Sequence, residues 1–240
     1  GLPAWKELLH EVAIDVGITE EEFDEIAKFD PRDQATLLSK DREDEFRKAV
    51  SNRLSSERYS LLHGLLSSLP VNEFVTTNFD NLFELAAARP GEEIPVIPGG
   101  VVSAGKRWLL KLHGTIGKDL VLTRGEYLGS VSTHAALRGL VQAMLLTRHM
   151  LFVGYSMTDE DFHQLVHEVR TSVKDHKNKS FGTVTLLQGR QHLSRLWPDL
   201  TFVSTDVGIN NPKDLNPSAR NLAIMLDYVG AKSASDIGFV

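Results

Sequence analysis

The sequence predicts an α/β fold in which a mostly parallel sheet is covered by helices, with a small helical insertion. Short runs of apolar or β-branched residues alternate with helix-like segments, a pattern typical of parallel strands that are joined by helices. The run over 150–153 is continuously apolar, as expected for a strand that is buried on both faces. A charged, helix-favouring stretch predicts that the insertion occupies residues 18–69.

Local patterns predict the individual elements. Apolar residues spaced along one face predict a helix over 5–16. Thr19 and Glu22 have the spacing of a helix-capping box. The Pro- and Gly-rich piece over 90–105 predicts a loop or an extended connection. The predicted strands are Glu73–Thr77, Trp108–Leu112, Met150–Val153, Thr183–Leu187 and Thr201–Ser204.

Length and composition set broad limits. With 240 residues and an ordinary apolar fraction, the chain is expected to form a single domain over 1–240. Its formal net charge of −6 gives no global electrostatic reason to bind nucleic acid or an anionic membrane. The chain has no cysteine, so neither disulfides nor thiolate zinc sites are expected. The sequence has no membrane-spanning apolar run, which predicts a cytoplasmic protein. Gly1-Leu2-Pro3 resembles the interior of a longer sequence, so we expect a further segment upstream.

Polar clusters follow three of the predicted strands, at 76–80, 113–115 and 154–159. Because the carboxyl ends of parallel strands meet at one edge of a sheet, we expect the clusters to converge in a crevice that binds a ligand. Each cluster also has a purely structural interpretation. Asn78 or Asp80 could cap the following helix, and a tight turn could require Gly154. The joint placement of the three clusters favours a ligand site.

Four motifs occur in order along the chain: Gly1-Leu2-Pro3-Ala4-Trp5 with Leu8-Leu9, then Thr77-Asn78-Phe79-Asp80, Leu112-His113-Gly114 and Gly154-Tyr155-Ser156. Their order resembles that of the sirtuin superfamily. More narrowly, it resembles the bacterial sirtuin-like branch, whose members are NAD-consuming effector domains of anti-phage defence. The resemblance covers Gly1 to about Ser204 and implies a Rossmann-like NAD-binding fold. Residues 122–127 also resemble a strand-to-helix junction of such relatives, which we expect to be structural, with Arg124 as a candidate for charge contacts.

The resemblance implies a catalytic pair, Asn78 and His113, at the nicotinamide–ribose bond of NAD+. His113 would be the general base, since an imidazole can accept a proton near neutral pH. Asn78 can both donate and accept hydrogen bonds, so it can hold a water molecule or a ribose hydroxyl. Asp80 would bind the carboxamide or offset the charge of a developing ribosyl cation. The implied cofactor-binding residues are Thr77, Asp80, Gly154, Tyr155 and Ser156.

The sequence departs from the wider superfamily in two respects. The glycine-rich phosphate loop would lie upstream of Gly1, so the residues that bind the pyrophosphate stay unassigned. The zinc-binding cysteines of protein-deacetylating sirtuins are absent, because the chain has no cysteine. We therefore expect hydrolysis of NAD+ to nicotinamide and ADP-ribose, without a metal. The alternatives within this chemistry are NAD-dependent ADP-ribosyl transfer and deacylation.

Two further alternatives come from other functional classes. A non-catalytic module could sense NAD or ADP-ribose, but a sensor does not need both Asn78 and His113. A metal hydrolase could be built on His163 and His167, whose i, i+4 spacing matches a zinc-protease helix that here lacks its glutamate.

The expected partners are NAD+ and other protein chains or domains. The resemblance implies a homo-oligomer or a multi-subunit defence complex with a sensor or regulatory domain, either fused or separate. No membrane partner is expected. Lys174, Lys177 and Lys179 lack an interleaved aromatic platform, which favours a solvated loop over a nucleic-acid contact.

Overall fold

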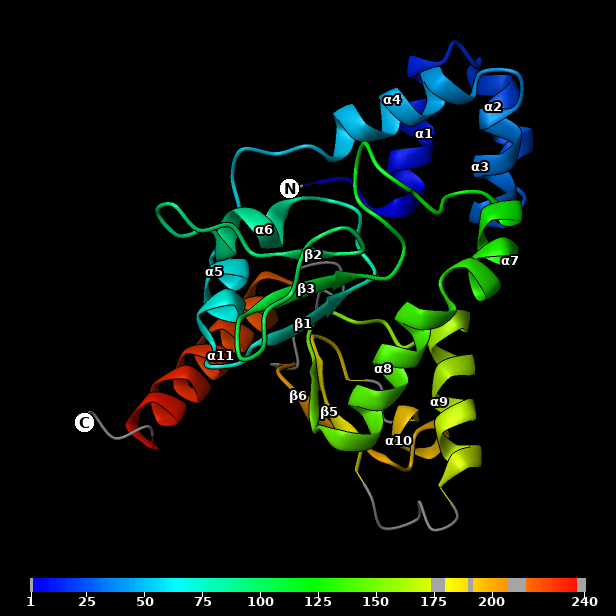
Figure 1. Ribbon diagram of the computed structural model, residues 1–240. Coiled ribbons are helices and arrows are strands. Elements are labelled where there is room, and N and C mark those ends of the chain that lie inside the picture. The colour runs from blue at the N-terminus through cyan, green and yellow to red at the C-terminus, as the bar shows by residue number, and fades with distance from the viewer. Residues whose placement is uncertain (1, 174–179, 190–191, 207–214, 237–240) are drawn as a thin grey trace. The chain divides into compact units, whose positions relative to one another are not determined.

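The computed structural model describes residues 2–173, 180–189, 192–206 and 215–236 of the chain (Figure 1). The predicted lysine-rich loop at Lys174, Lys177 and Lys179 lies outside these residues. The chain divides into two compact units. Unit 1 comprises Gly1–Ser67 and Val71–Leu137, and unit 2 comprises Ser68–Pro70 and Arg138–Val240. The single domain over 1–240 and its insertion bounds stay predictions.

Unit 1 contains a three-stranded parallel sheet with the order β1-β3-β2. Its strands are β1 (Glu73–Thr76), β2 (Val96–Ile97) and β3 (Trp108–Lys111). The middle strand, β3, is buried along its whole length. A short helix, α6 (Leu82–Ala87), follows β1. The short strand β2 lies inside the segment that was predicted as a loop or an extended connection.

The helices α1 to α4 form one cluster, drawn in blue in Figure 1. They bury a shared apolar core that includes Leu9, Val12, Leu38 and Val50, each fully buried. The core also takes in Leu122, from the segment that leads into α7. This cluster accounts for most of the predicted insertion, while α5 follows after a break. The bounds are α1 Trp5–Asp15, α2 Glu20–Ile26, α3 Pro31–Ser39, α4 Glu43–Leu54, α5 Leu61–Ser68 and α7 Arg124–Thr133.

Unit 2 contains a second parallel sheet, with the sequential order β4-β5-β6. The run over 150–153 forms β4, which lies at an edge of this sheet, and Leu151 in it is 38% exposed. The prediction that this run is a strand buried on both faces is therefore wrong. The strands are β4 Met150–Phe152, β5 Gly182–Leu186 and β6 Leu200–Ser204. The helices are α8 Ala135–Thr147, α9 Glu160–Ser172, α10 Leu193–Leu196 and α11 Asn216–Asp236.

The predicted fold class is confirmed, since parallel strands alternate with helices in both units. The five predicted strands form at the predicted places, but they are divided between two three-stranded sheets. The capping box at Thr19 also forms, with the Glu22 amide donating to Thr19 Oγ1 at 3.3 Å. No helix in the described part of the chain is both long and apolar enough to cross a membrane.

The junction at 122–127 is structural, as predicted. Glu126 Oε2 accepts hydrogen bonds from the amides of Leu122 (2.9 Å) and Thr123 (2.8 Å), and its other oxygen pairs with Arg47 on α4. Burial alone would raise the pKa of Glu126. The amide hydrogen bonds from Thr123 and Leu122, together with that from Arg47, outweigh burial and hold this pKa below its usual value. Glu126 therefore joins the helical cluster to the start of α7 in its ionised form.

We expect Glu126→Gln to lower the free energy of unfolding by about 1.5–3 kcal/mol at neutral pH, because the substitution removes charge-assisted hydrogen bonds. A lowered folded-state pKa stabilises the fold above the unfolded-state pKa. This stabilisation is lost as the pH falls from about 4.5, the ordinary pKa of a glutamate in the unfolded chain, through the lower pKa of Glu126 in the folded state. Urea unfolding of both proteins across this range measures the difference. The exposed Glu93→Gln is the control, and a pH-independent difference would contradict the assignment.

Candidate functional site

The site begins where the neighbouring strands β1 and β3 end. Thr76 and Lys111 are paired in the parallel register, and the Leu112 amide donates to the Thr76 carbonyl at 3.0 Å. Asn78 and His113 each lie two residues beyond this pair, at the carboxyl ends of adjacent strands. The structure therefore brings the start of both predicted catalytic turns together at one sheet edge within unit 1.

The turn after β1 is held by short-range hydrogen bonds. The Asn78 amide donates to Thr76 Oγ1 at 3.1 Å, while the Asn78 side chain is exposed. Asp80 Oδ1 accepts from the Leu82 amide, the first of α6, at 3.0 Å, so Asp80 does satisfy a donor at the start of the helix, although the N-cap residue is Asn81. The structural interpretation thus holds for Asp80 and is compatible with a ligand contact through the rest of its carboxylate. Thr77 lies partly exposed at the start of the turn.

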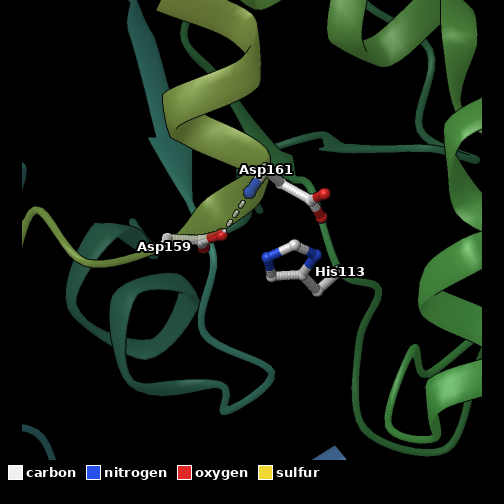
Figure 2. Close-up of side chains that lie close together, drawn as sticks. All are labelled: His113, Asp159 and Asp161. Carbon is white, nitrogen blue, oxygen red and sulfur yellow. Dashed lines mark hydrogen bonds between the residues drawn. The ribbon is translucent and has the colours of Figure 1, made fainter.

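His113 is buried and stands in a row of rings (Figure 2 shows the side chain on the segment after β3). Its ring centroid lies 6.4 Å from that of Phe79 and 5.1 Å from that of Tyr127. The Trp5 ring centroid lies 5.7 Å from that of Phe79, and the Arg32 guanidinium lies 4.0 Å above the Tyr127 ring. Phe79 and Tyr127 therefore pack near the imidazole, and side chains from α1 and α3 pack against these two rings in turn.

A tight turn follows His113 and depends on Gly114. The His113 carbonyl accepts from the Val121 amide at 3.0 Å, and Thr115 pairs with Lys118 across the turn. Gly114 has φ +90°, and a Cβ atom there would lie 1.9 Å from the Asp119 carbonyl oxygen. Only glycine fits this position without moving the chain next to the histidine.

The third cluster, 154–159, lies in unit 2 after β4. Ser156 Oγ and Thr158 Oγ1 share a hydrogen bond at 2.7 Å, and both residues are exposed. Asp159 caps α9 by accepting from the Asp161 amide at 3.0 Å, the dashed line in Figure 2. Gly154 has φ +67°, as its turn interpretation predicts. The convergence of this cluster with the two clusters of unit 1 stays a prediction.

Tyr155 packs into an aromatic group of unit 2. Its ring contacts Phe162 edge-on at 5.2 Å and lies 6.2 Å from Phe152. This packing fixes the residue between Gly154 and Ser156 and gives it a structural role in addition to the predicted cofactor contact.

The histidine pair on α9 has one structural member. His163 Nε2 donates to the Met157 carbonyl at 2.8 Å, and its ring contacts Trp197 edge-on at 4.7 Å. His163 therefore helps to hold the segment before α9, while His167 is exposed one turn further on.

Lys111 and Tyr127 are two residues next to the site that were not predicted from the sequence. Lys111 could have been found, because a lysine inside the apolar run of a buried strand needs partners to offset the cost of burying its charge. Tyr127 gave no comparable signal, since its contact with His113 joins positions distant in the sequence.

Comparison with known proteins finds sirtuin-like relatives. The model of the SIR2-like domain family matches residues 72–200, which include Asn78, His113 and Ser156. The chain is 29% identical over 128 residues to Defense-associated sirtuin 2 of Bacillus subtilis, covering 50% of this chain and 13% of that protein. It is 23% identical over 197 residues to NAD(+) hydrolase ThsA of Enterococcus faecium, covering 75% of this chain and 39% of that protein. The chain thus spans less than half the length of either relative.

We expect Gly114→Ala to destabilise the protein by at least about 3 kcal/mol, because its new methyl group collides with backbone. Gly117→Ala is the matched control. Gly117 also has positive φ (+75°), but nothing lies within 4 Å of its Cβ position, so only backbone strain of about 1–2 kcal/mol is expected. Denaturant unfolding of both variants measures the difference. Equal losses would show that the Asp119 carbonyl moves away at little cost.

We expect the purified protein to hold no stoichiometric zinc, because His163 is engaged with a backbone carbonyl and the chain offers no thiolate ligand. Elemental analysis of the wild type and of His163→Ala and His167→Ala tests this expectation. Zinc at one equivalent that disappears in either variant would show that α9 carries a metal site.

Proposed function

This chain belongs to the SIR2-like family, and from that premise we propose that it is an NAD+ hydrolase. The reaction would cleave the nicotinamide–ribose bond and give nicotinamide and ADP-ribose. The name of the Enterococcus faecium relative, NAD(+) hydrolase, supports the same activity. The observation that carries the proposal is the placement of Asn78 and His113 two residues beyond a paired position of adjacent parallel strands.

The proposed reaction consumes one water molecule. The bond between ribose C1′ and the pyridinium nitrogen breaks, and its electron pair neutralises the positive charge of the nicotinamide ring. Water adds its oxygen to C1′ and loses a proton. His113 takes this proton, either directly or through a ribose hydroxyl, which is the task of a general base. Asn78 holds the water or the hydroxyl, because its carboxamide can donate and accept at once.

The remaining predicted residues would bind NAD+ around this centre. The Asp80 carboxylate stabilises the positive charge that develops on the ribose, or accepts a hydrogen bond from the carboxamide. Thr77 lines the same turn. Gly154, Tyr155 and Ser156 bind the ribose and phosphates from the turn after β4. This part of the proposal requires the turn of unit 2 to face the same ligand.

The biological role we propose is depletion of NAD+ by a cytoplasmic effector of bacterial anti-phage defence. The name of the Bacillus subtilis relative, a defence-associated sirtuin, supports this role. An enzyme that destroys NAD+ must be restrained until infection. The restraint would come from a sensor or regulatory domain, or from assembly into an oligomer, in regions beyond those matched here.

We expect His113→Ala and Asn78→Ala each to reduce nicotinamide release by about 10²–10⁴-fold, the usual loss when a general base or a comparable group is removed. Asn78 is exposed, so its loss should leave no cavity and little change in melting temperature. The assay incubates the activated full-length protein with NAD+, identifies the products by mass spectrometry and records melting of each variant.

Two exposed residues provide matched controls. His167→Ala and Asn52→Ala make the same substitutions on α9 and α4, and both should retain wild-type activity. A His113 or Asn78 variant that melts like the wild type and still releases nicotinamide within a few-fold of it would remove that residue from the mechanism. Binding of NAD+ by the wild type without any product would favour the sensor instead.

A further inference from the structure

Lys111 is a buried cation at the last position of the central strand β3. Its side chain is 0% exposed, and the three strand residues before it are apolar and buried. Burying an ammonium group is costly unless charge and hydrogen bonds compensate for the lost water. A lysine at this position is therefore kept in place by specific partners.

The partners of Lys111 all belong to the segment that follows β1. The ammonium group donates to the Phe79 carbonyl at 3.1 Å and to the Asp80 carbonyl, and it pairs with Glu84 Oε1 at 2.5 Å. These three acceptors match the three N–H donors of a lysine. Two of the three are backbone atoms, so Lys111 fixes the course of the chain as well as compensating a charge.

Glu84 depends on Lys111 in turn. Glu84 lies on α6, and its second oxygen, Oε2, is buried without a hydrogen bond from any described residue. Loss of the lysine would leave this carboxylate without its cation, which is a costly arrangement in a partly buried site. The pair thus ties the end of β3 to the first turn of α6.

The contacts of Lys111 lie next to both proposed catalytic residues in the sequence. Phe79 and Asp80 directly follow Asn78, and Lys111 precedes His113 by two residues on β3. The Phe79 carbonyl also accepts from the Ile116 amide at 3.1 Å, a second link between the two turns. Lys111 therefore joins the turn of Asn78 to the end of the strand that leads to His113.

We propose that Lys111 is the positioning residue of the active site, holding the Asn78–Asp80 turn at the distance from His113 that the reaction needs. The inference rests on the proposed NAD+ hydrolase function. A misplacement of about 1 Å in such a site can cost on the order of 10²-fold in rate. Lys111 itself touches neither the substrate nor the reacting atoms in this proposal.

The test separates anchoring from charge compensation in the full-length protein. Lys111→Met removes the anchor and leaves Glu84 uncompensated. The double variant Lys111→Met with Glu84→Gln removes the anchor and the charge together. The matched control is the double variant Arg170→Met with Asp199→Asn, which removes another ion pair with a buried carboxylate, at 2.5 Å between α9 and the start of β6.

Three quantities are measured for each variant: the melting temperature, kcat and KM for nicotinamide release, and hydrogen exchange of the peptide that covers 77–84. We expect Lys111→Met to have the lowest melting temperature, and the melting temperature of the Lys111/Glu84 double variant to recover toward that of the control. The kcat of the double variant should stay at least about tenfold below that of the control, with KM changed only a few-fold. In the double variant the amides of Asn78 and Leu82 should exchange faster than in the wild type, while those of the control should not.

Each other outcome overturns a stated claim. A folded Lys111/Glu84 double variant with the kcat of the control, or with unchanged exchange over 77–84, overturns the positioning role. If the activated wild type releases no nicotinamide, the NAD+ hydrolase proposal fails by itself. Hydrogen exchange then decides the anchor alone: faster exchange over 77–84 supports it, and unchanged exchange overturns it.

Discussion

The parallel pairing of β1 with β3 is the constraint on which the site in unit 1 depends. The register sets Thr76 against Lys111, so the two chains leave the sheet side by side and in the same direction. The other contacts of the site hold the side chains and turns that follow these two strand ends. The aromatic row packs near the imidazole, the turn at Gly114 leads the chain away, and the buried lysine holds the opposite turn. A change in register by one residue would disturb all of these contacts together.

The site combines groups that are costly for folding. An ammonium group is buried at the end of the central strand, a carboxylate is partly buried, and a glycine adopts a positive φ next to the imidazole. The surrounding helices help to offset these costs. The apolar core of α1 to α4 and the ion pair between Arg47 and Glu126 support α7, which presents Tyr127 to His113. The helical region is thus part of the framework that holds the imidazole.

Elements with strong local signals could be predicted from the sequence. The strands β1, β3 and β5 consist mostly of apolar or β-branched residues, and the capping box at Thr19 depends only on residues three positions apart. The short strand β2 could not be predicted, because Val96 and Ile97 lie between prolines and form a strand only by pairing with β3. The division of the strands into two sheets is equally non-local, since it depends on which strands pair.

The same distinction applies to the site. The polar clusters that contain Asn78 and His113 could be predicted because each follows a predicted strand, whereas the choice of these two residues as a catalytic pair came from the resemblance to the sirtuin superfamily. The structural role of Asp80 is supported by the hydrogen bond from the Leu82 amide, while its contact with NAD+ stays a prediction. The partners of Lys111 and Tyr127 lie 31 and 14 residues away in the sequence. A lysine within an apolar run marks Lys111 as unusual, but no local pattern identifies the partner of either residue.

The aromatic row also gives the chain an optical property. Trp5 is one of three tryptophans, and its indole contacts Phe79, the residue after Asn78. Trp108 and Trp197 are both buried, Trp108 inside a strand and Trp197 at the end of α10. Indole emission changes with the polarity around the ring, so a displacement of the turn that carries Asn78 alters the surroundings of Trp5 directly. The chain thus contains an intrinsic fluorophore beside the proposed reactive centre, and its emission offers a label-free report on movement of the Asn78 turn.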